Sequence, residues 1–292
     1  LHEIIAAMPS EEVTFQSTEN NWANIMGGKV EYKLVGMPDR DFPKIPGHRE
    51  TEYGKVEAAT LREMIDKTIF SVSVDETRFH LNGVLFESDG ATAKMISTDG
   101  HRLTKVERSL AGGPQLSTGV IIPKKGLIEL KRVLDGASDS CEIAVGDSYV
   151  FLKVGEVALA VKLIRSEFPP YDQVIPKKSD KKVMFPRGPF LEAVKRAQLM
   201  SSETRGVKVA LTKGLLRISS DNPALGELKE EIDLDYTGAD LTIGFNPQYI
   251  TELLTQMTND FVCVELSGEL DPAAIHPPDS TAYVGVIMPM RI

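Results

Sequence analysis

The sequence contains little cysteine. Its 292 residues include only Cys141 and Cys263, and both lie in strand-like runs of apolar residues. A small secreted chain stabilised by disulfides carries more cysteines, usually in an even number at regular spacings. We therefore interpret the two cysteines as reduced and buried, and we expect a cytoplasmic protein.

Long hydrophobic runs are also absent. No stretch approaches the roughly 20 apolar residues that a membrane-spanning helix needs, and no charged segment followed by an apolar one opens the chain. No membrane association is therefore expected. The segment Leu1–Met8 has the apolar spacing of a helix interior, so the chain is expected to begin inside a domain.

Motifs for binding metals, nucleotides and cofactors are missing. No HExxH spacing and no cysteine pair accompanies the single histidines, which are His2, His48, His80, His101 and His276. We therefore expect no metal site. The glycine doublets that begin at Gly27 and Gly112 do not continue into a phosphate-binding loop. They indicate turns, and no cofactor is expected.

One dense polar cluster, Ser97–Leu103, could carry chemistry. Ser97, Asp99 and His101 are the residue types of a hydrolase triad. Triad members normally come from separated elements, however, and the strained turn that presents the nucleophile is lacking. A turn between strands, or a surface recognition loop, explains the cluster equally well. No catalytic residues are predicted, and a hydrolase is only a third alternative.

An internal repeat organises the chain. Leu1–Met8 resembles Leu127–Leu134 in its apolar face and in the position of a glutamate, and Phe245–Met257 contains a third copy. After each of the first two helices, two strand-like runs lead to a Phe-Pro pair, at Phe42 and at Phe168. Such self-similarity predicts repeated structural units.

A second kind of helix is also duplicated, at Glu57–Ser73 and Pro186–Ser202, and its apolar spacing predicts one face packed on a sheet. Between the helices, alternating runs predict antiparallel strands at Phe79–Glu87, Ala93–Gly100, Val207–Leu211 and Gly214–Ser219. The sequence therefore predicts an α+β fold of repeated units, each with two helices packed on antiparallel sheets. We expect the unit boundaries to be 1–49, the end of an earlier copy, 50–178 and 179–292.

The charge pattern allows a local basic surface on an acidic protein. The net charge of −9 argues against extensive coating of nucleic acid. Basic residues nevertheless gather on two predicted helices, at Lys124, Lys125, Lys131, Arg132, Lys195 and Arg196. Such faces are most often simply solvated. If the repeat brings them together, they form a positive track for a phosphate backbone.

The last residues, 282–292, are mostly apolar and include two methionines. Loose termini are normally polar. This segment is therefore expected to pair in a sheet or to line a groove that binds peptides.

The repeat, the Asp99–Leu103 loop and the Met288–Ile292 ending together resemble the bacterial DNA sliding clamp family, the beta subunit of the replicative polymerase. The similarity covers nearly the whole chain and includes Leu81–Glu87, Val120–Leu130, Phe168–Tyr171 and Arg205–Val207. The resemblance implies clamp domains arranged as an arc of a ring around double-stranded DNA, closed by a head-to-tail homodimer. It also implies that the N-terminal part of the first domain has no counterpart here.

The resemblance further implies a hydrophobic cleft that binds peptides of the DNA polymerase catalytic subunit, the clamp loader and repair polymerases. Its residues would be Leu81, Thr98, Gly100, His101, Arg102, Leu103, Pro169, Val174, Val286, Met288, Pro289, Met290 and Arg291, with Asn246 and Tyr249 at the edge. The contact between subunits would use Leu199, Met200, Glu227, Glu230 and Glu231.

Two departures from the family pattern are visible. Gln173 stands where the family often has arginine, and residues 270–280, which contain three prolines, do not match the usual strand. The leading hypothesis is a processivity factor that holds DNA by enclosure, with contacts mostly to phosphate. The alternative is a peptide-binding interaction hub that does not encircle DNA.

Overall fold

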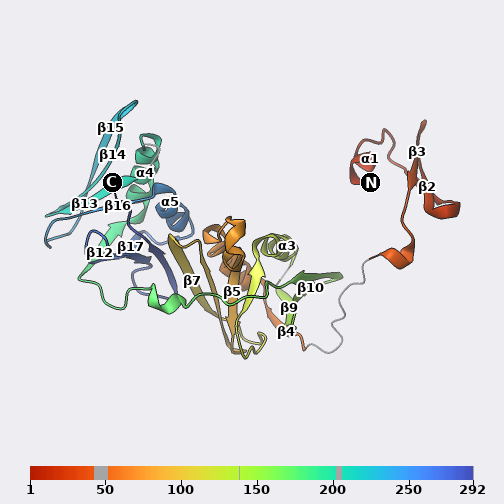
Figure 1. Ribbon diagram of the computed structural model, residues 1–292, viewed down its shortest axis with the longest axis horizontal. Helices are drawn as coiled ribbons and strands as arrows, with labels where there is room; N and C mark the ends of the chain where they lie inside the picture. Colours follow the sequence, from red (N-terminus) through yellow and green to blue (C-terminus); the bar gives the residue numbers. More distant parts are fainter. Residues whose placement is uncertain (43–51, 138, 202–205, 292) are drawn as a thin grey trace. The chain divides into compact units, whose positions relative to one another are not determined.

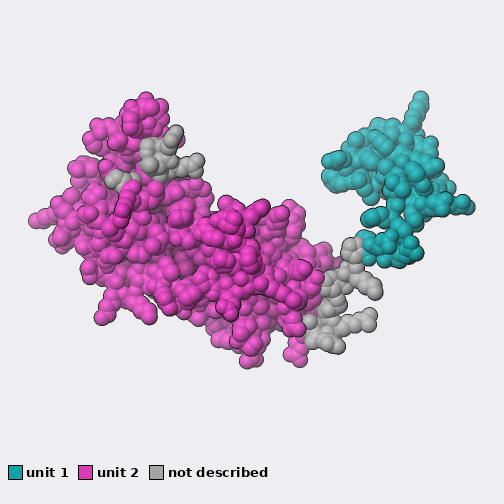
Figure 2. All heavy atoms as spheres, viewed as in Figure 1, with its two compact units in different colours: residues 1–47 teal, residues 48–292 magenta. Residues whose placement is uncertain are grey.

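The computed structural model describes residues 1–42, 52–137, 139–201 and 206–291. The chain divides into two compact units, residues 1–47 and 48–292 (Figure 2). Expectations for Pro43, His48, Arg205 and Ile292 fall outside the described ranges. None of the helices within those ranges has the length and apolar character that a bilayer crossing demands.

The first unit consists of a short helix followed by an antiparallel sheet. Helix α1 (His2–Ala6) confirms the predicted opening helix, and the sheet contains the strands β1 (Thr14–Ser17), β2 (Trp22–Gly27) and β3 (Val30–Val35). Gly28 turns the chain between β2 and β3 with φ at 61°, a left-handed conformation that glycine adopts without strain.

The second unit contains the same series of elements twice. The first series comprises β4 (Gly54–Glu57), α2 (Ala58–Asp66), β5 (Gly83–Ser88), β6 (Thr92–Thr98), β7 (Arg102–Ser109), β8 (Val120–Pro123), α3 (Lys124–Leu134), β9 (Ser140–Val145), β10 (Tyr149–Val154) and β11 (Val157–Lys162). The second comprises β12 (Lys181–Pro186), α4 (Arg187–Leu199), β13 (Val207–Thr212), β14 (Leu215–Asn222), β15 (Gly226–Asp233), β16 (Leu241–Phe245), α5 (Pro247–Thr255), β17 (Phe261–Leu266), β18 (Ala273–His276) and β19 (Tyr283–Ile287). The repeat is confirmed. The prediction of two strands after the repeated helix was wrong by one. Three strands follow each of α1, α3 and α5.

The two series share one sheet. Its eight strands, of which Figure 1 labels β12, β17, β7 and β5, have the order β12-β17-β18-β19-β7-β6-β5-β8. The pairing of β19 with β7 joins the halves, for example at Val286 opposite Leu103. A four-stranded sheet stands at either side, in the orders β11-β10-β9-β4 and β15-β14-β13-β16. Helices α2 and α3 pack together, as do α4 and α5. The α+β prediction is therefore confirmed.

The eight-stranded sheet has buried apolar side chains on both faces. On the helix side, apolar residues such as Leu127, Phe190 and Leu253 join a continuous core. A smaller apolar cluster on the opposite face, the outer cluster, comprises Leu85, Ile96, Leu103, Ile121, Ala274, Val284 and Val286. It is covered by Ile164, Phe168, Tyr171 and Ile175, which belong to the segment between β11 and β12. This segment therefore belongs to the packed structure.

A hydrogen bond fastens that covering segment to the sheet. The Tyr171 hydroxyl donates to Glu87 Oε2 at 2.9 Å. Burial, together with this bond to a carboxylate, raises the pKa of Tyr171, so the phenol stays protonated as a donor.

The strand predicted for Phe79–Glu87 begins later than expected. Glu76–Leu81 forms a 3-10 helix, because Asp75 Oδ1 accepts hydrogen bonds from the Thr77 backbone N–H at 2.9 Å and from the Thr77 hydroxyl at 2.6 Å. This capping turns the chain and delays the strand until Gly83.

Residues 270–280, which do not match the family's usual strand in sequence, do contain a strand. Ala273–His276 forms β18, which pairs with both β17 and β19. Pro272 precedes it and Pro277 follows it. Proline has no backbone N–H to donate to a ladder, which accounts for a strand of only four residues.

Candidate functional site

The turn between β6 and β7 is fixed by one carboxylate. Asp99 Oδ1 accepts hydrogen bonds from the backbone N–H groups of His101, at 2.9 Å, and Arg102, at 3.0 Å. Gly100 has φ at 88°, which the turn requires and which a side chain would strain. The polar cluster noticed in the sequence is thus a fully satisfied turn that presents His101 to solvent.

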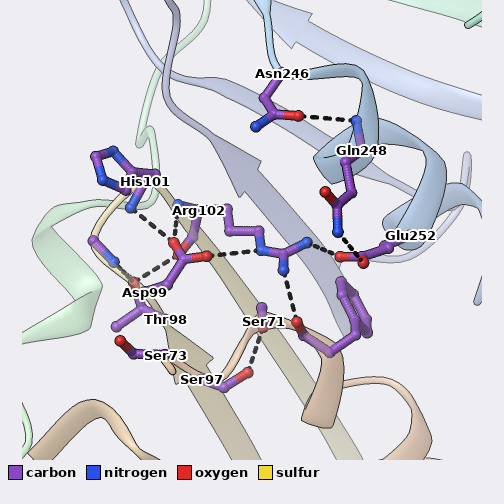
Figure 3. Close-up of polar contacts among 12 residues, drawn as sticks. Ser71, Ser73, Ser97, Thr98, Asp99, His101, Arg102, Asn246, Gln248 and Glu252 are labelled. Carbon is purple, nitrogen blue, oxygen red and sulfur yellow. Dashed lines mark hydrogen bonds and ion pairs between the residues drawn. The ribbon is translucent and has the colours of Figure 1, made fainter. Parts of the chain in front are cut away.

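The Arg102 guanidinium lies at the centre of a polar network (Figure 3). Its Nε donates to Asp99 Oδ2 at 3.0 Å, its Nη2 donates to the Phe70 backbone carbonyl at 2.7 Å, and its Nη1 donates to Glu252. The guanidinium also stacks on Phe70 and Tyr249, with Cζ 5.4 and 4.4 Å from the ring centroids. Arg102 is only 8% exposed, so these bonds replace its hydration.

Arg102 therefore connects the two halves of the second unit. Asp99 and Phe70 belong to the first series of elements, while Tyr249 and Glu252 lie on α5 of the second. Burial and the nearby Asp99 carboxylate raise the pKa of Tyr249, so its ring remains an uncharged stacking partner.

The residues of the suspected triad are not assembled. Ser97 is fully buried, and its hydroxyl donates to the Thr68 carbonyl at 2.6 Å and lies 3.0 Å from the Thr104 hydroxyl. The Asp99 carboxylate is engaged by Arg102 and the turn amides, and His101 is exposed. The hydrolase hypothesis therefore has no geometric support in the described part of the chain.

The predicted cleft residues divide into a buried floor and an exposed rim. Leu81, Leu103 and Val286 are 5%, 1% and 0% exposed, and Leu103 and Val286 are paired across β7 and β19 within the outer cluster. The exposed residues are Gly100, His101, Pro169, Val174, Met288 and Arg291, and the half-buried ones are Thr98, Asn246, Tyr249, Pro289 and Met290. Val174 and Met288 are exposed apolar side chains at 41% and 36%.

The chain after β19 crosses from the β6–β7 turn to the neighbouring four-stranded sheet. The Met288 backbone N–H donates to the His101 carbonyl at 2.9 Å, and the Met290 N–H donates to the Gly244 carbonyl at 2.8 Å, with Pro289 half-buried between them. Asn246 caps α5 by accepting from the Gln248 N–H at 3.0 Å. The predicted sheet pairing of this tail is confirmed in β19, and the residues after β19 include the exposed Met288.

Arg291, which was predicted to belong to the peptide cleft, lies at a different surface. It lines an open depression of about 590 Å³ together with Lys208, Ser219 and Glu227. The structure therefore brings Arg291 close to the predicted subunit contact.

Most of the predicted DNA-facing cations are already paired within the chain. Lys131 contacts Asp66 of α2 at 2.5 Å and Arg132 contacts Glu129 at 2.6 Å. On α4, Lys195 contacts Glu192 at 2.9 Å and Arg196 contacts Glu230 at 2.5 Å. Among the described residues, Lys124 and Lys125 at the start of α3 have no ion pair.

The predicted subunit-contact residues lie at the end of α4 and on strand β15. Leu199 is 77% exposed and Met200 is half-buried. Glu230 is paired with Arg196, and Glu231 and Glu227 are paired with Arg217 and Lys229, at 2.7 and 3.0 Å. Strand β15 is an edge strand of its sheet, so its outer backbone groups have no neighbouring strand among the described elements.

The two halves of the second unit correspond to two family models. The central domain of the DNA polymerase III beta subunit matches residues 55–170, and the C-terminal domain of the same subunit matches residues 172–291. The beta sliding clamp of Pseudomonas aeruginosa is 31% identical to the whole chain, which covers 80% of that relative. The chain belongs to the bacterial beta sliding clamp family.

Other clamps agree with this assignment. The beta sliding clamp of Escherichia coli is 32% identical over 92% of the chain and 73% of its own length. The solved Bacillus subtilis clamp covers 99% of the chain with a TM-score of 0.92 at 29% identity, and 77% of that structure is matched. The Pseudomonas aeruginosa DNA polymerase III subunit beta gives a TM-score of 0.90 at 31% identity, over 99% of this chain and 80% of that structure.

Sequence reasoning on this clamp missed the partners of Arg102. Glu252 was recognised only as the glutamate of a repeated helix, and Phe70 was not singled out. The residue that corresponds to Glu252 in the earlier repeat, Glu129, pairs with Arg132 on its own helix. The position of Glu252 in the repeat therefore carried no signal for a contact with a residue 150 positions away.

Proposed function

We propose that this clamp is a processivity factor that encircles duplex DNA and tethers the replicative polymerase to it. The observation that carries the proposal is the match of both halves of the second unit, in order, to consecutive domains of one beta subunit. Residues 1–49, 50–178 and 179–292 would then be the end of the first clamp domain, the second domain and the third domain. The role needs no chemical step.

The peptide cleft would lie over the outer cluster, between the β6–β7 turn, the 169–174 segment and the tail. Its buried floor and its exposed Val174 and Met288 support an apolar anchor pocket, and His101 supplies a polar rim. Peptides of the polymerase catalytic subunit, the clamp loader and repair polymerases are the proposed ligands. A solved clamp of Pseudomonas aeruginosa is bound to griselimycin, which supports a ligand-binding surface in the family.

Ring closure would use the end of α4 and the free edge of β15. The exposed Leu199 offers an apolar contact, and an edge strand can pair with a strand of a second subunit. The helices would face the DNA, where the interaction is with phosphate and independent of sequence.

The lysines at the start of α3 provide a test of DNA contact. We expect the double change Lys124→Glu and Lys125→Glu to weaken DNA binding and to reduce its dependence on salt, because two unpaired cations that could approach phosphates are replaced. With about two contacts removed, the slope of log K against log salt should fall by about 1.8. Fluorescence anisotropy with labelled duplex DNA at several salt concentrations measures this.

The matched control is Lys177→Glu with Lys178→Glu, an exposed lysine pair outside the helices. It changes the net charge equally and should leave a larger share of the salt slope intact. Equal losses in the two double variants would show that only overall charge matters and would contradict a DNA-facing α3.

The interaction hub remains the second candidate because four of the six predicted DNA-facing cations are paired with carboxylates. A hub would bind clamp-motif peptides as well as a clamp does. It would not be retained on closed DNA.

A further inference from the structure

A cluster of metal-ligating side chains lies outside the surfaces described above. Cys263 and Glu265 project from the same face of β17, and His276 of β18 stands directly opposite Cys263 in the strand register. All three are buried, and their ligand atoms lie within 4.8 Å of one another. The neighbouring Ala274 belongs to the outer cluster, which places the group on the outer face of the eight-stranded sheet.

The orientation of the His276 ring is fixed by its surroundings. Nδ1 lies 2.7 Å from the Pro277 carbonyl oxygen, which can only accept, so Nδ1 carries the proton. Nε2 then faces Glu265 Oε1 at 3.2 Å. Nε2 can carry a second proton, which makes the ring an imidazolium that donates to the carboxylate. Alternatively, Nε2 presents a lone pair to the carboxylate, and this arrangement requires a bound cation. A backbone carbonyl on Nδ1 is the usual outer contact of a histidine that binds metal through Nε2.

The Glu265 carboxylate is held ready as an anion. The Ser179 hydroxyl donates to Oε2 at 2.9 Å, and Lys182 Nζ lies 2.6 Å from Oε1. Both contacts stabilise the charged form of this buried carboxylate. The Lys182 side chain is 65% exposed, so it can move into solvent and leave Oε1 to another cation.

We propose that Cys263 Sγ, Glu265 Oε1 and His276 Nε2 bind one thiophilic divalent cation, with Zn²⁺ as the expected ion and water as the fourth ligand. Tetrahedral coordination at ordinary zinc distances separates ligand atoms by about 3.4–3.6 Å, close to the spacing present between the histidine and the glutamate. Binding converts the Cys263 thiol to a thiolate and releases its proton to solvent. The bound ion, thiolate and carboxylate together carry no net charge.

This site has a structural consequence. Ser179 and Lys182 lie where the covering segment enters β12, and Ser179 already contacts Glu265. A metal that fixes the Glu265 carboxylate would therefore hold the end of that segment against the sheet.

Cobalt titration of the purified chain under reducing conditions tests the proposal. One equivalent of Co²⁺ should produce a thiolate-to-cobalt charge-transfer band, and one equivalent of Zn²⁺ should abolish it. Cys263→Ser and His276→Gln should lose the band, and Ser179→Ala should weaken binding about tenfold through loss of the outer contact. Zn²⁺ should also raise the Tm of the unchanged protein.

Cys141→Ser is the matched control, because Cys141 is the other buried cysteine and belongs to β9. It should retain the band. Absence of the band in the unchanged protein would overturn the proposal. A band that survives Cys263→Ser but disappears in Cys141→Ser would overturn it as well. The unchanged protein alone decides the matter if a variant fails to fold.

Discussion

Removal of residues 288–292 is expected to abolish binding of a clamp-motif peptide while the protein stays folded. The deletion removes the exposed Met288 and the tail that crosses to β16, and with them one wall of the proposed cleft. Strand β19 ends at Ile287 and keeps its pairing with β7 and β18. Loss of this apolar wall is expected to cost at least about 100-fold in affinity. Titration of a fluorescent clamp-motif peptide measures the effect.

A single change refines this test. Met288→Ala should weaken the peptide at least about tenfold, whereas Met184→Ala should leave its affinity unchanged. Met184 is similarly exposed, at 41%, but lies on β12 at the far edge of the eight-stranded sheet. Unchanged peptide affinity in the truncated protein, or equal losses in the two methionine variants, would refute this placement of the cleft.

Arg102→Ala is expected to lower the free energy of unfolding by about 3 kcal/mol, because breaking a buried, hydrogen-bonded ion pair leaves charges without a partner. Asp99 and Glu252 lose their cation, and the Phe70 carbonyl loses its donor. The estimate lies at the lower end of the usual range because Glu252 is 31% exposed and regains some water. Urea denaturation followed by circular dichroism measures the change.

Arg217→Ala supplies the comparison. Arg217 also pairs with a carboxylate, Glu231 at 2.7 Å, but both side chains are about half exposed, at 46% and 51%. Such a surface pair contributes at most about 1 kcal/mol. If Arg102→Ala is no more destabilising than Arg217→Ala, Arg102 does not hold the two halves together.

The parts of the fold that follow a local period could be predicted from the sequence. The helix from Lys124 to Leu134 and the helix from Pro247 to Thr255 repeat the same apolar spacing, and a helix needs only its own residues to show that pattern. The α+β architecture and its repetition were visible for this reason. The family resemblance then predicted which residues form the peptide cleft.

What could not be predicted depends on contacts between distant segments. The ion pair of Arg102 with Glu252 and the apposition of Cys263 with His276 are fixed by strand register and by the joining of β7 to β19. Neither pair has a characteristic spacing in the sequence. The late start of β5 at Gly83 has another cause, because a cap at Asp75 overrides a strand-like alternation.

The sequence also could not show which cleft residues are buried and which are exposed. Leu103 and Met288 are both apolar and both come from strand ends, yet one is 1% exposed and the other 36%. Only the three-dimensional packing of the 164–175 segment on the outer face separates the floor from the rim.

Retention on DNA tests the central claim most directly. The full-length protein would be loaded by a clamp loader onto nicked circular DNA and, in parallel, onto the same DNA made linear, and the fraction that stays bound after gel filtration would be measured. A ring that holds DNA by enclosure stays on the circle and slides off the free ends. Retention on the circle with loss from the linear form is the expected result, and equal loss from both would contradict the clamp function.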